Sequence, residues 1–393
     1  MPHFRPRHLQ TRLQKLSTFW PIVGVTGMRQ VGKTTLLEKQ IRFHSVASLD
    51  HDSTRSDAEN SAVSFLSKLE TPALIDEIQK VPKLFDALKY LVHKNKKPGQ
   101  YFVTGSVSFS EGADIRESLT GRIGTCQLFP LTLSEALEMP PPDKPTIEIK
   151  NGMKPRVSLE DFSRAMIRGG MPVPMFLRDP SQVETFFEGW LNTSVLRDLS
   201  RFMGKKFEAD FAFALLEKIG RALREGELPT SAHFGGSSSR KLNNYLTAFE
   251  SIFLMRRIRC HELGTGKDAW LPTDSGFANY LMKDTRGEGA TLSLARLTVL
   301  NELFSVHESI GKPFFLRYFK SAKGTPVDFI FEDTPVRIVP LADTSRGPWG
   351  HYEKSVLGAM KTLKSNRGIL LAPVDRAHIQ KAGISILPWM VWS

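Results

Sequence analysis

The apolar positions of the first 138 residues alternate between short continuous runs and runs with helical spacing. Apolar runs bounded by glycine, proline or polar residues predict buried strands at 21–27, 45–50, 72–77 and 100–106. Between two of these runs, residues 81–94 repeat leucines at the spacing of one helix face. Strand and helix alternating in this way predict an α/β domain built on a parallel sheet.

A proline cluster predicts the first boundary in the chain. The segment MPPPDKP (139–145) holds four prolines, which a helix interior does not tolerate. The pattern after it is mainly helical, and it then becomes a mixture of one long helix (about 291–309) with short apolar runs. We therefore expect four parts: an α/β domain at 1–138, a Pro-rich linker at 139–157, a helical region at 158–262 and a small α/β domain at 263–393.

The segment GMRQVGKT directly follows the first predicted strand and opens a helix. Gly27, Gly32, Lys33 and Thr34 fit the spacing G-x-x-x-x-G-K-[ST] of a phosphate-binding loop, and the strand–loop–helix context is the one this motif requires. Backbone N–H groups and the helix N-terminus are expected to hold phosphates, Lys33 to bridge the β- and γ-phosphates, and Thr34 to bind Mg²⁺. The remaining expected nucleotide-binding positions are Met28, Arg29, Gln30, Val31 and Thr35.

A pair of carboxylates ends the strand at 72–77. Ligands in open α/β sheets bind beyond the carboxyl ends of the strands, so Asp76 and Glu77 are expected to face the phosphates. Asp76 suits the outer shell of Mg²⁺, and Glu77 suits polarising an attacking water. The alternative is that the two carboxylates only face solvent at the end of a strand and have no part in catalysis. A strand near 46–49 led us to expect the two motifs on adjacent central strands.

Further candidates follow the strand at 100–106. Thr104 or Ser106 could report the γ-phosphate, although both residue types are also common in turns. Arg122 is a candidate arginine finger, acting within its own subunit or on a neighbour, with an ordinary surface arginine as the alternative. The chain has no guanine-reading N-K-x-D segment, which favours ATP.

Charge and cysteine content indicate the partners and the cellular compartment to expect for the protein. Lys and Arg number 53 against 41 Asp and Glu, which gives a net charge of +12 and favours polyanionic partners, although a solvated basic face would explain it as well. No apolar run reaches the roughly 20 residues of a membrane span, and the N-terminus has no apolar leader. The two cysteines are far apart in sequence, so we expect a cytoplasmic protein without a membrane partner.

Several segments in order resemble prokaryotic AAA-type ATPases that carry a C-terminal domain of unknown function. They are GMRQVGKTTLL, LIDEIQKVPKLFDALK, YFVTGS, ESLTGRI and PLTLSEAL, with looser matches at GGMPVP, LRDLS, TDSGFANYL and VDFIFE. The resemblance implies a P-loop core of AAA/ASCE type, a winged-helix-like middle and a restriction-endonuclease-like end.

Nucleases of that type bind Mg²⁺ through a helix Glu, a strand Asp and a following E-x-K. Glu302 and Asp328 match the first two positions, but Leu341 and Asp343 stand where E-x-K would fall. We therefore expect no nuclease activity and a structural role for Asp328, held by a turn or a nearby cation.

The winged-helix resemblance offers two alternatives for the middle of the chain. The segment 237–245 could enter a DNA groove, with Arg240 and Lys241 on phosphates and further cations at 96–99 and 255–259. It could instead pack on the core as a regulatory lid. The leading hypothesis is an Mg²⁺-dependent ATPase coupled to a C-terminal DNA- or protein-binding region, as a monomer or a homo-oligomer. The competing one is a slow or non-hydrolysing ATP switch.

Overall fold

The computed structural model describes residues 4–109, 119–141, 152–235, 239–312, 314–322, 326–340, 350–379 and 383–390. Among them, five parallel strands form one sheet in the order β2-β3-β4-β1-β5. The strands are β1 (Ile22–Thr26), β2 (Ser45–Ser48), β3 (Ala73–Asp76), β4 (Tyr101–Gly105) and β5 (Ile123–Gln127). Four of them lie where the apolar runs predict strands, and the parallel sheet is confirmed. β5 was not predicted.

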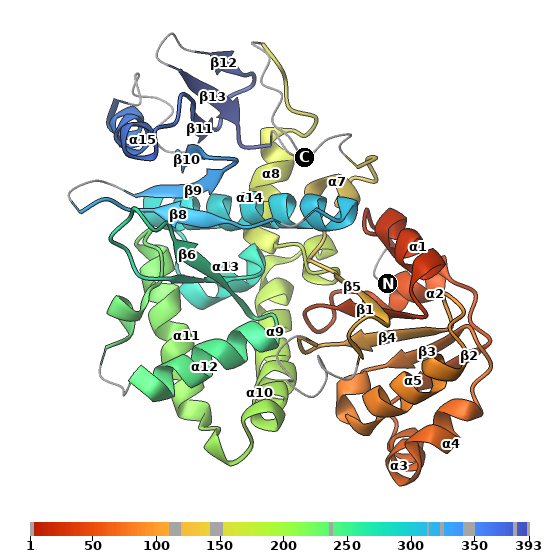
Figure 1. Cartoon of the computed structure of the whole chain (residues 1–393). Coiled ribbons are helices and arrows are strands. Elements are labelled where there is room, and N and C mark those ends of the chain that lie inside the picture. Colours follow the sequence, from red (N-terminus) through yellow and green to blue (C-terminus); the bar gives the residue numbers. More distant parts are fainter. Residues whose placement is uncertain are drawn as a thin grey trace.

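Strand order corrects one expectation. β4 lies between β1 and β3 and pairs with both, so the strands that carry the two nucleotide motifs are not adjacent. Helices cover this sheet (Figure 1). They are α1 (Gln10–Phe19), α2 (Lys33–Gln40), α3 (Asp52–Asn60), α4 (Ala62–Ser67), η1 (Ile78–Lys80) and α5 (Lys83–Lys94), followed beyond β5 by α7 (Leu133–Ala136).

The middle of the chain is helical, as expected. Its elements are α8 (Leu159–Arg168), η2 (Pro174–Phe176), α9 (Pro180–Trp190), η3 (Leu191–Val195), α10 (Leu196–Met203), η4 (Gly204–Lys206), α11 (Ala209–Arg224), η5 (Ser231–Phe234) and α12 (Ser239–Ser251). A strand, β6 (Met255–Cys260), follows and pairs antiparallel with β7 (Ala269–Pro272). β6 also pairs with β8 (Arg317–Phe319), so the second sheet crosses the boundary expected at residue 262.

The C-terminal region is a mixed sheet with helices. In the described residues its eight strands run in the order β12-β13-β11-β10-β9-β8-β6-β7. The elements not yet named are α13 (Ser275–Met282), α14 (Glu288–Ile310), β9 (Val327–Phe331), β10 (Thr334–Ile338), α15 (Gly350–Leu363), β11 (Gly368–Ala372), β12 (His378–Ile379) and β13 (Ile384–Pro388).

α14 joins the two halves of the molecule. It is buried along most of its length and runs from the second sheet toward α1 and α7 (Figure 1). Its apolar side chains belong to one core that extends from Leu9 through the helical region to Met390. A helix that is apolar on nearly all sides must lie in an interior. The arrangement of the helical region on the first sheet is therefore held by continuous packing, which positions the site described next.

Candidate functional site

The loop between β1 and α2 depends on two glycines with positive φ. Gly27 has φ 149° and Gly32 has φ 98°, values that side chains with a Cβ rarely adopt. A Cβ on Gly27 would also lie 2.3 Å from the Leu128 carbonyl oxygen. Gly32 caps α2 without a side-chain hydrogen bond. The first N–H groups of α2 thus have no side-chain cap at this end, which suits an anion.

Side chains of the loop point in different directions. Met28 and Val31 are buried in the core, so only their backbone groups can face a ligand. Gln30 and Thr35 are exposed. Lys33 is buried, and its Nζ donates to the carbonyl oxygens of Gly27 (2.9 Å) and Met28 (3.1 Å).

Burial lowers the pKa of Lys33, while the carboxylates of Glu77 and Asp76 act in the opposite direction. The Lys33 ammonium is therefore held over the loop, between its carbonyl oxygens and the two acidic side chains. A cation in this position can contact phosphate oxygens that the loop N–H groups bind.

Thr34, Asp76 and Thr104 meet at the carboxyl edge of the sheet. The Thr34 hydroxyl donates to Asp76 Oδ1 at 2.7 Å, and the Thr104 hydroxyl donates to the same oxygen at 2.5 Å. A hydroxyl beside a single carboxylate suits Mg²⁺, which is commonly held by one or two carboxylates together with substrate phosphates. Among the described residues there is no group of three His, Cys, Asp or Glu that could hold a metal unaided. The donor set therefore fits Mg²⁺ only together with a phosphate ligand.

Glu77 is held in one position by three contacts. It adopts a left-handed backbone (φ 58°, ψ 45°), and its N–H donates to Thr104 Oγ1 at 3.0 Å. Its Oε2 accepts from Ser106 Oγ at 2.8 Å and from Gln79 Nε2. Thr104 and Ser106, both buried, thus contact the two carboxylates directly.

The environment favours the ionised form of Glu77. Burial alone raises the pKa of Glu77, but the charge of Lys33 and the hydrogen bonds from Gln79 and Ser106 bring that pKa below its ordinary value. A carboxylate that is ionised at neutral pH can accept a proton from water, which is the chemistry of a general base.

Arg122 does not lie at this edge. It immediately precedes β5, whose Ile123 pairs with Ile22 at the start of β1. β1 and β5 are parallel, so Arg122 lies at the amino ends of the strands, whereas the loop follows the carboxyl end of β1. Its Nη1 donates to the Thr120 carbonyl oxygen at 3.2 Å. This position disfavours action within its own subunit, and a role on a neighbouring subunit and an ordinary surface arginine both stay predictions.

Three residues at the site were not singled out from the sequence. Gln79 contacts Glu77 and Ser106, the latter at 3.1 Å. Arg7 donates through Nε to the buried Glu135 carboxylate at 3.1 Å and through Nη1 to the Val31 carbonyl oxygen at 3.0 Å, so it supports the loop from behind.

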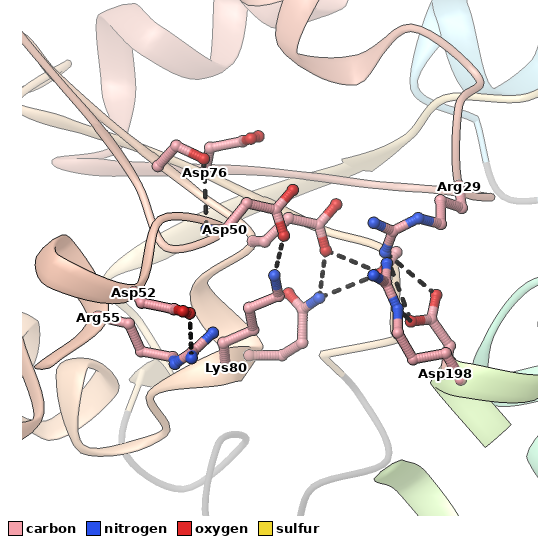
Figure 2. Close-up of polar contacts among 12 residues, drawn as sticks. Arg29, Asp50, Asp52, Arg55, Asp76, Lys80 and Asp198 are labelled. Atoms are coloured by element: carbon pink, nitrogen blue, oxygen red, sulfur yellow. Dashed lines mark hydrogen bonds and ion pairs between the residues drawn. The ribbon is translucent and has the colours of Figure 1, made fainter. Parts of the chain in front are cut away.

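The third residue, Asp198 of α10, pairs with Arg29 of the loop at 3.4 Å; Figure 2 shows this pair beside Lys80. The segment LRDLS had suggested a resemblance but no role for Asp198. Apart from the contact between Gln79 and Glu77, these contacts join residues far apart in the chain, so local spacing carried no signal for them.

The two acidic residues expected from the nuclease resemblance contact other protein groups in the structure. Asp328 Oδ1 accepts from Arg296 at 2.8 and 2.6 Å, and its Oδ2 accepts from the Ile338 N–H at 2.7 Å. Arg337 adds a longer ion pair at 3.2 Å. Although burial raises the pKa of Asp328, the two arginines lower it below its ordinary value. The expectation that a nearby cation holds Asp328 is confirmed, and its structural role stays a prediction.

Glu302 is engaged elsewhere. Its Oε1 accepts from the Leu133 N–H at 2.5 Å, at the end of the first domain, and burial raises the pKa of Glu302 to about 8. The two acidic positions expected from the nuclease resemblance thus have separate partners. Leu341 and Asp343 lie outside the described residues.

Several cations considered for DNA contact have protein partners. Lys241 pairs with Glu208 at 2.7 Å, and the guanidinium of the half-buried Arg256 lies 3.6 Å from the centroid of the Phe304 ring. Arg257 pairs with Asp268. Arg240 is exposed on α12, and the start of the segment 237–245 lies outside the described residues. Within the part of the chain that the structure describes, no helix has the length and apolar character needed to cross a membrane.

Comparison with protein families gives a match to the first domain. Residues 20–137 match the family described as "AAA domain". The uncharacterized proteins Mb2031c of Mycobacterium bovis and Rv2008c of Mycobacterium tuberculosis are each 27% identical to this chain over 260 residues, which is 64% of this chain and 53% of each relative. The chain thus spans about half the length of these curated relatives.

A solved structure with a similar arrangement is the Walker-type ATPase paby2304 of Pyrococcus abyssi. It is 14% identical, and the match covers 71% of this chain and 96% of that chain with a TM-score of 0.45. The family match and the parallel sheet together establish an AAA-type P-loop domain at the N-terminus.

Proposed function

Because residues 20–137 form an AAA-type P-loop domain, we propose that the protein is a cytoplasmic, Mg²⁺-dependent ATPase that cleaves ATP to ADP and phosphate. The observation that carries the proposal is the ionised Glu77, held by Ser106 and Gln79 at the edge of the sheet that also carries the loop. An ionised carboxylate beside the loop can take a proton from water, which ATP cleavage requires and ATP binding alone does not.

Each residue has a defined part in the proposed reaction. The loop N–H groups and Lys33 hold the β- and γ-phosphates, and Thr34 and Asp76 would hold Mg²⁺. When bound there, Mg²⁺ would supply positive charge to the phosphate oxygens. Glu77 orients water for attack on the γ-phosphorus and takes its proton, while the bond to the β-phosphate oxygen breaks. Thr104 accepts from the Glu77 backbone N–H and donates to the Asp76 carboxylate, so it fixes Asp76 relative to the Glu77 backbone.

A second candidate is an ATP-dependent switch with very slow turnover. It is favoured by the hydrogen bonds that Glu77 Oε2 already accepts from Ser106 and Gln79, because these compete with a water molecule for the same oxygen. In either case the C-terminal half would respond to nucleotide through the contact between Arg29 and Asp198. Its partner would be DNA, through exposed cations such as Arg240, or a protein.

The proposal is tested by phosphate release from Mg·ATP together with nucleotide affinity. Wild type is compared with Lys33→Ala and with Lys68→Ala, a lysine that is exposed, distant in sequence from the loop and outside the segments considered for DNA contact. We expect Lys33→Ala to lower turnover by about 100-fold or more, since removing one charged contact in a phosphate site has effects of this size. Lys68→Ala should match wild type.

Adding duplex DNA at about 50 mM salt identifies the class of partner, because phosphate contacts are strongest there. Turnover that rises with DNA supports a nucleic-acid partner, and unchanged turnover favours a protein. If the protein binds ATP but turns it over no faster than Lys33→Ala does, the ATPase proposal is contradicted and the slow ATP-dependent switch is the remaining candidate.

A further inference from the structure

A cavity of about 360 Å³ lies between the end of the first domain and the start of the helical region. One wall comes from α7 and the N-terminal segment, and the other comes from α8 and the turn η2 that follows it. Figure 1 shows α7 close to α8 at this junction. A backbone contact joins the two sides, because the Leu131 N–H donates to the Gly170 carbonyl oxygen at 2.7 Å. The cavity is therefore formed by two parts of the chain that are fixed against each other.

Much of the cavity lining is apolar. Buried side chains of both walls contribute to it, namely Leu133, Ala136, Ala165 and Met175. Leu137 lines the cavity as well and is 43% exposed, so the apolar surface continues outward to solvent. A concave apolar surface that is open to solvent is typical of a binding site, because a ligand that covers it removes apolar area from water.

Positive charge accompanies this apolar lining. The charged residues that line the cavity, among those that the structure describes, are four arginines and one aspartate: Arg5, Arg164, Arg168, Arg178 and Asp161. Arg5 and Arg164 pair with nearby carboxylates. Arg168 and Arg178 have no carboxylate partner in the described part of the chain, and Arg168 donates instead to the Arg178 carbonyl oxygen at 3.3 Å. A ligand that carries carboxylates would supply the missing charge, and arginine binds carboxylates through paired hydrogen bonds.

A second cavity, of about 230 Å³, adjoins the first, because Arg168 lines both. Its apolar lining includes Val183, Phe187 and Ile167, of which Ile167 is 51% exposed. Asn279 also lines it, and the buried Asn279 Oδ1 has no hydrogen-bond partner among the described residues. An acceptor of this kind suits a backbone N–H of an incoming chain. Two neighbouring apolar cavities with an arginine between them favour an extended peptide over a compact ligand, since alternate side chains of a peptide can enter separate pockets.

We propose that the two cavities together form a docking groove for an acidic, extended segment of a partner protein. Apolar side chains of that segment fill the cavities, and its carboxylates pair with Arg168 and Arg178. Nucleic acid would meet the arginines but has no aliphatic side chains to cover the apolar lining. None of residues 27–34 lines either cavity, so the groove is separate from the nucleotide loop. The inference therefore goes beyond ATP cleavage and does not depend on it.

The test measures the binding of short synthetic peptides to the full chain. One array of fluorescent peptides combines Asp or Glu with Leu, Ile or Phe, and two matched arrays replace either the acidic residues with Lys or the apolar residues with Ser. The variants are Arg168→Gln together with Arg178→Gln, and Leu137→Glu, which places a like charge beside an acidic ligand. Arg221→Gln is the matched control, because this arginine is exposed on α11 and lines neither cavity. All variants are compared by thermal melting to confirm that they fold.

We expect wild type to bind peptides of the acidic and apolar array and neither of the matched arrays. The double arginine variant should bind these peptides about 10-fold or more weakly, the size of effect expected when hydrogen bonds to charged groups are lost. Leu137→Glu should also weaken binding, and Arg221→Gln should match wild type. Added salt should lower the affinity of wild type, because salt screens the ion pairs. Affinity unchanged in both groove variants would overturn the proposal.

A charge reversal gives a result that misfolding cannot imitate. Arg168→Glu together with Arg178→Glu should lose the acidic peptides and gain the lysine peptides.

Three further results would overturn the docking groove. They are no binding of the acidic and apolar array by wild type, equal binding of the serine-substituted array, and displacement of bound peptide by duplex DNA, which would assign the arginines to nucleic acid. Lys33→Ala should bind the peptides as wild type does. If it does so while wild type releases no phosphate from ATP, the ATPase proposal has failed and the docking groove has not.

Discussion

Removing the Asp328 carboxylate should destabilise the C-terminal sheet strongly. Asp328→Ala would leave Arg296, which is 1% exposed, without the carboxylate that accepts two of its N–H groups. Arg337, at 7% exposed, and the Ile338 N–H would lose the same acceptor. Breaking a buried ion pair by removing one partner costs about 3–5 kcal/mol, because a charge remains buried without compensation.

The assay is urea unfolding followed by tryptophan fluorescence. Trp389 is a suitable reporter, since its indole N–H donates to the Val339 carbonyl oxygen at 3.0 Å, next to the strand that carries Arg337. Asp375→Ala is the control, because Asp375 is exposed and its ion pair among the described residues is with its neighbour Arg376. Exposed pairs contribute about 0–1 kcal/mol, so the control should unfold close to wild type.

The pH dependence gives an independent check on Asp328. Its pKa in the folded protein is lowered, so the stability it contributes is fully present above the ordinary aspartate pKa of about 3.9. That contribution is lost as the pH falls through the lower, folded value. The difference between wild type and Asp328→Asn should therefore be constant near neutral pH and shrink in acid. A difference under about 1 kcal/mol at neutral pH, or Mg²⁺-dependent DNA cleavage that requires Asp328, would refute the structural role.

Two further predictions concern the joint between the halves and the support of the loop. Arg7→Ala should lower the free energy of unfolding by about 3–5 kcal/mol, because Glu135 would stay buried without its cation. It should also weaken nucleotide affinity, because the Val31 carbonyl oxygen in the loop loses its donor. An unchanged urea midpoint would contradict this. Burial raises the pKa of Glu302 in the folded protein to about 8, so the folded state binds one more proton than the unfolded state between about pH 5 and 8. The stability of wild type should therefore fall as the pH rises through that range. Glu302→Gln should flatten this slope, and equal slopes in the two proteins would count against a neutral Glu302.

Local sequence was sufficient for those parts of the site that neighbouring residues build. Gly27, Gly32, Lys33 and Thr34 lie within eight consecutive residues that lead from β1 into α2. Their spacing alone was therefore sufficient to predict the shape of the loop. Four strands of the first sheet were likewise marked by apolar runs. Asp76 and Glu77 followed from the rule that ligands bind beyond the carboxyl ends of parallel strands.

The local sequence pattern did not predict contacts between residues that are distant in the chain. The order of strands depends on which edges meet in space, so the insertion of β4 between β1 and β3 left no mark in either motif. Arg122 was misplaced for a related reason, because the missed strand β5 determines which end of the sheet it occupies. Asp198 reaches the loop only because α14 and the shared core fix the helical region against the first domain.

The most direct test of the account is phosphate release by Glu77→Gln compared with wild type, with ATP affinity measured on the same samples. Glutamine keeps the size of the side chain and an oxygen that can accept from Ser106, but it cannot take a proton from water. We predict ATP affinity unchanged and turnover lower by about 10²–10⁴-fold, the usual contribution of a general base. Turnover equal to that of wild type would contradict the account, because Glu77 would then not be the group that activates water.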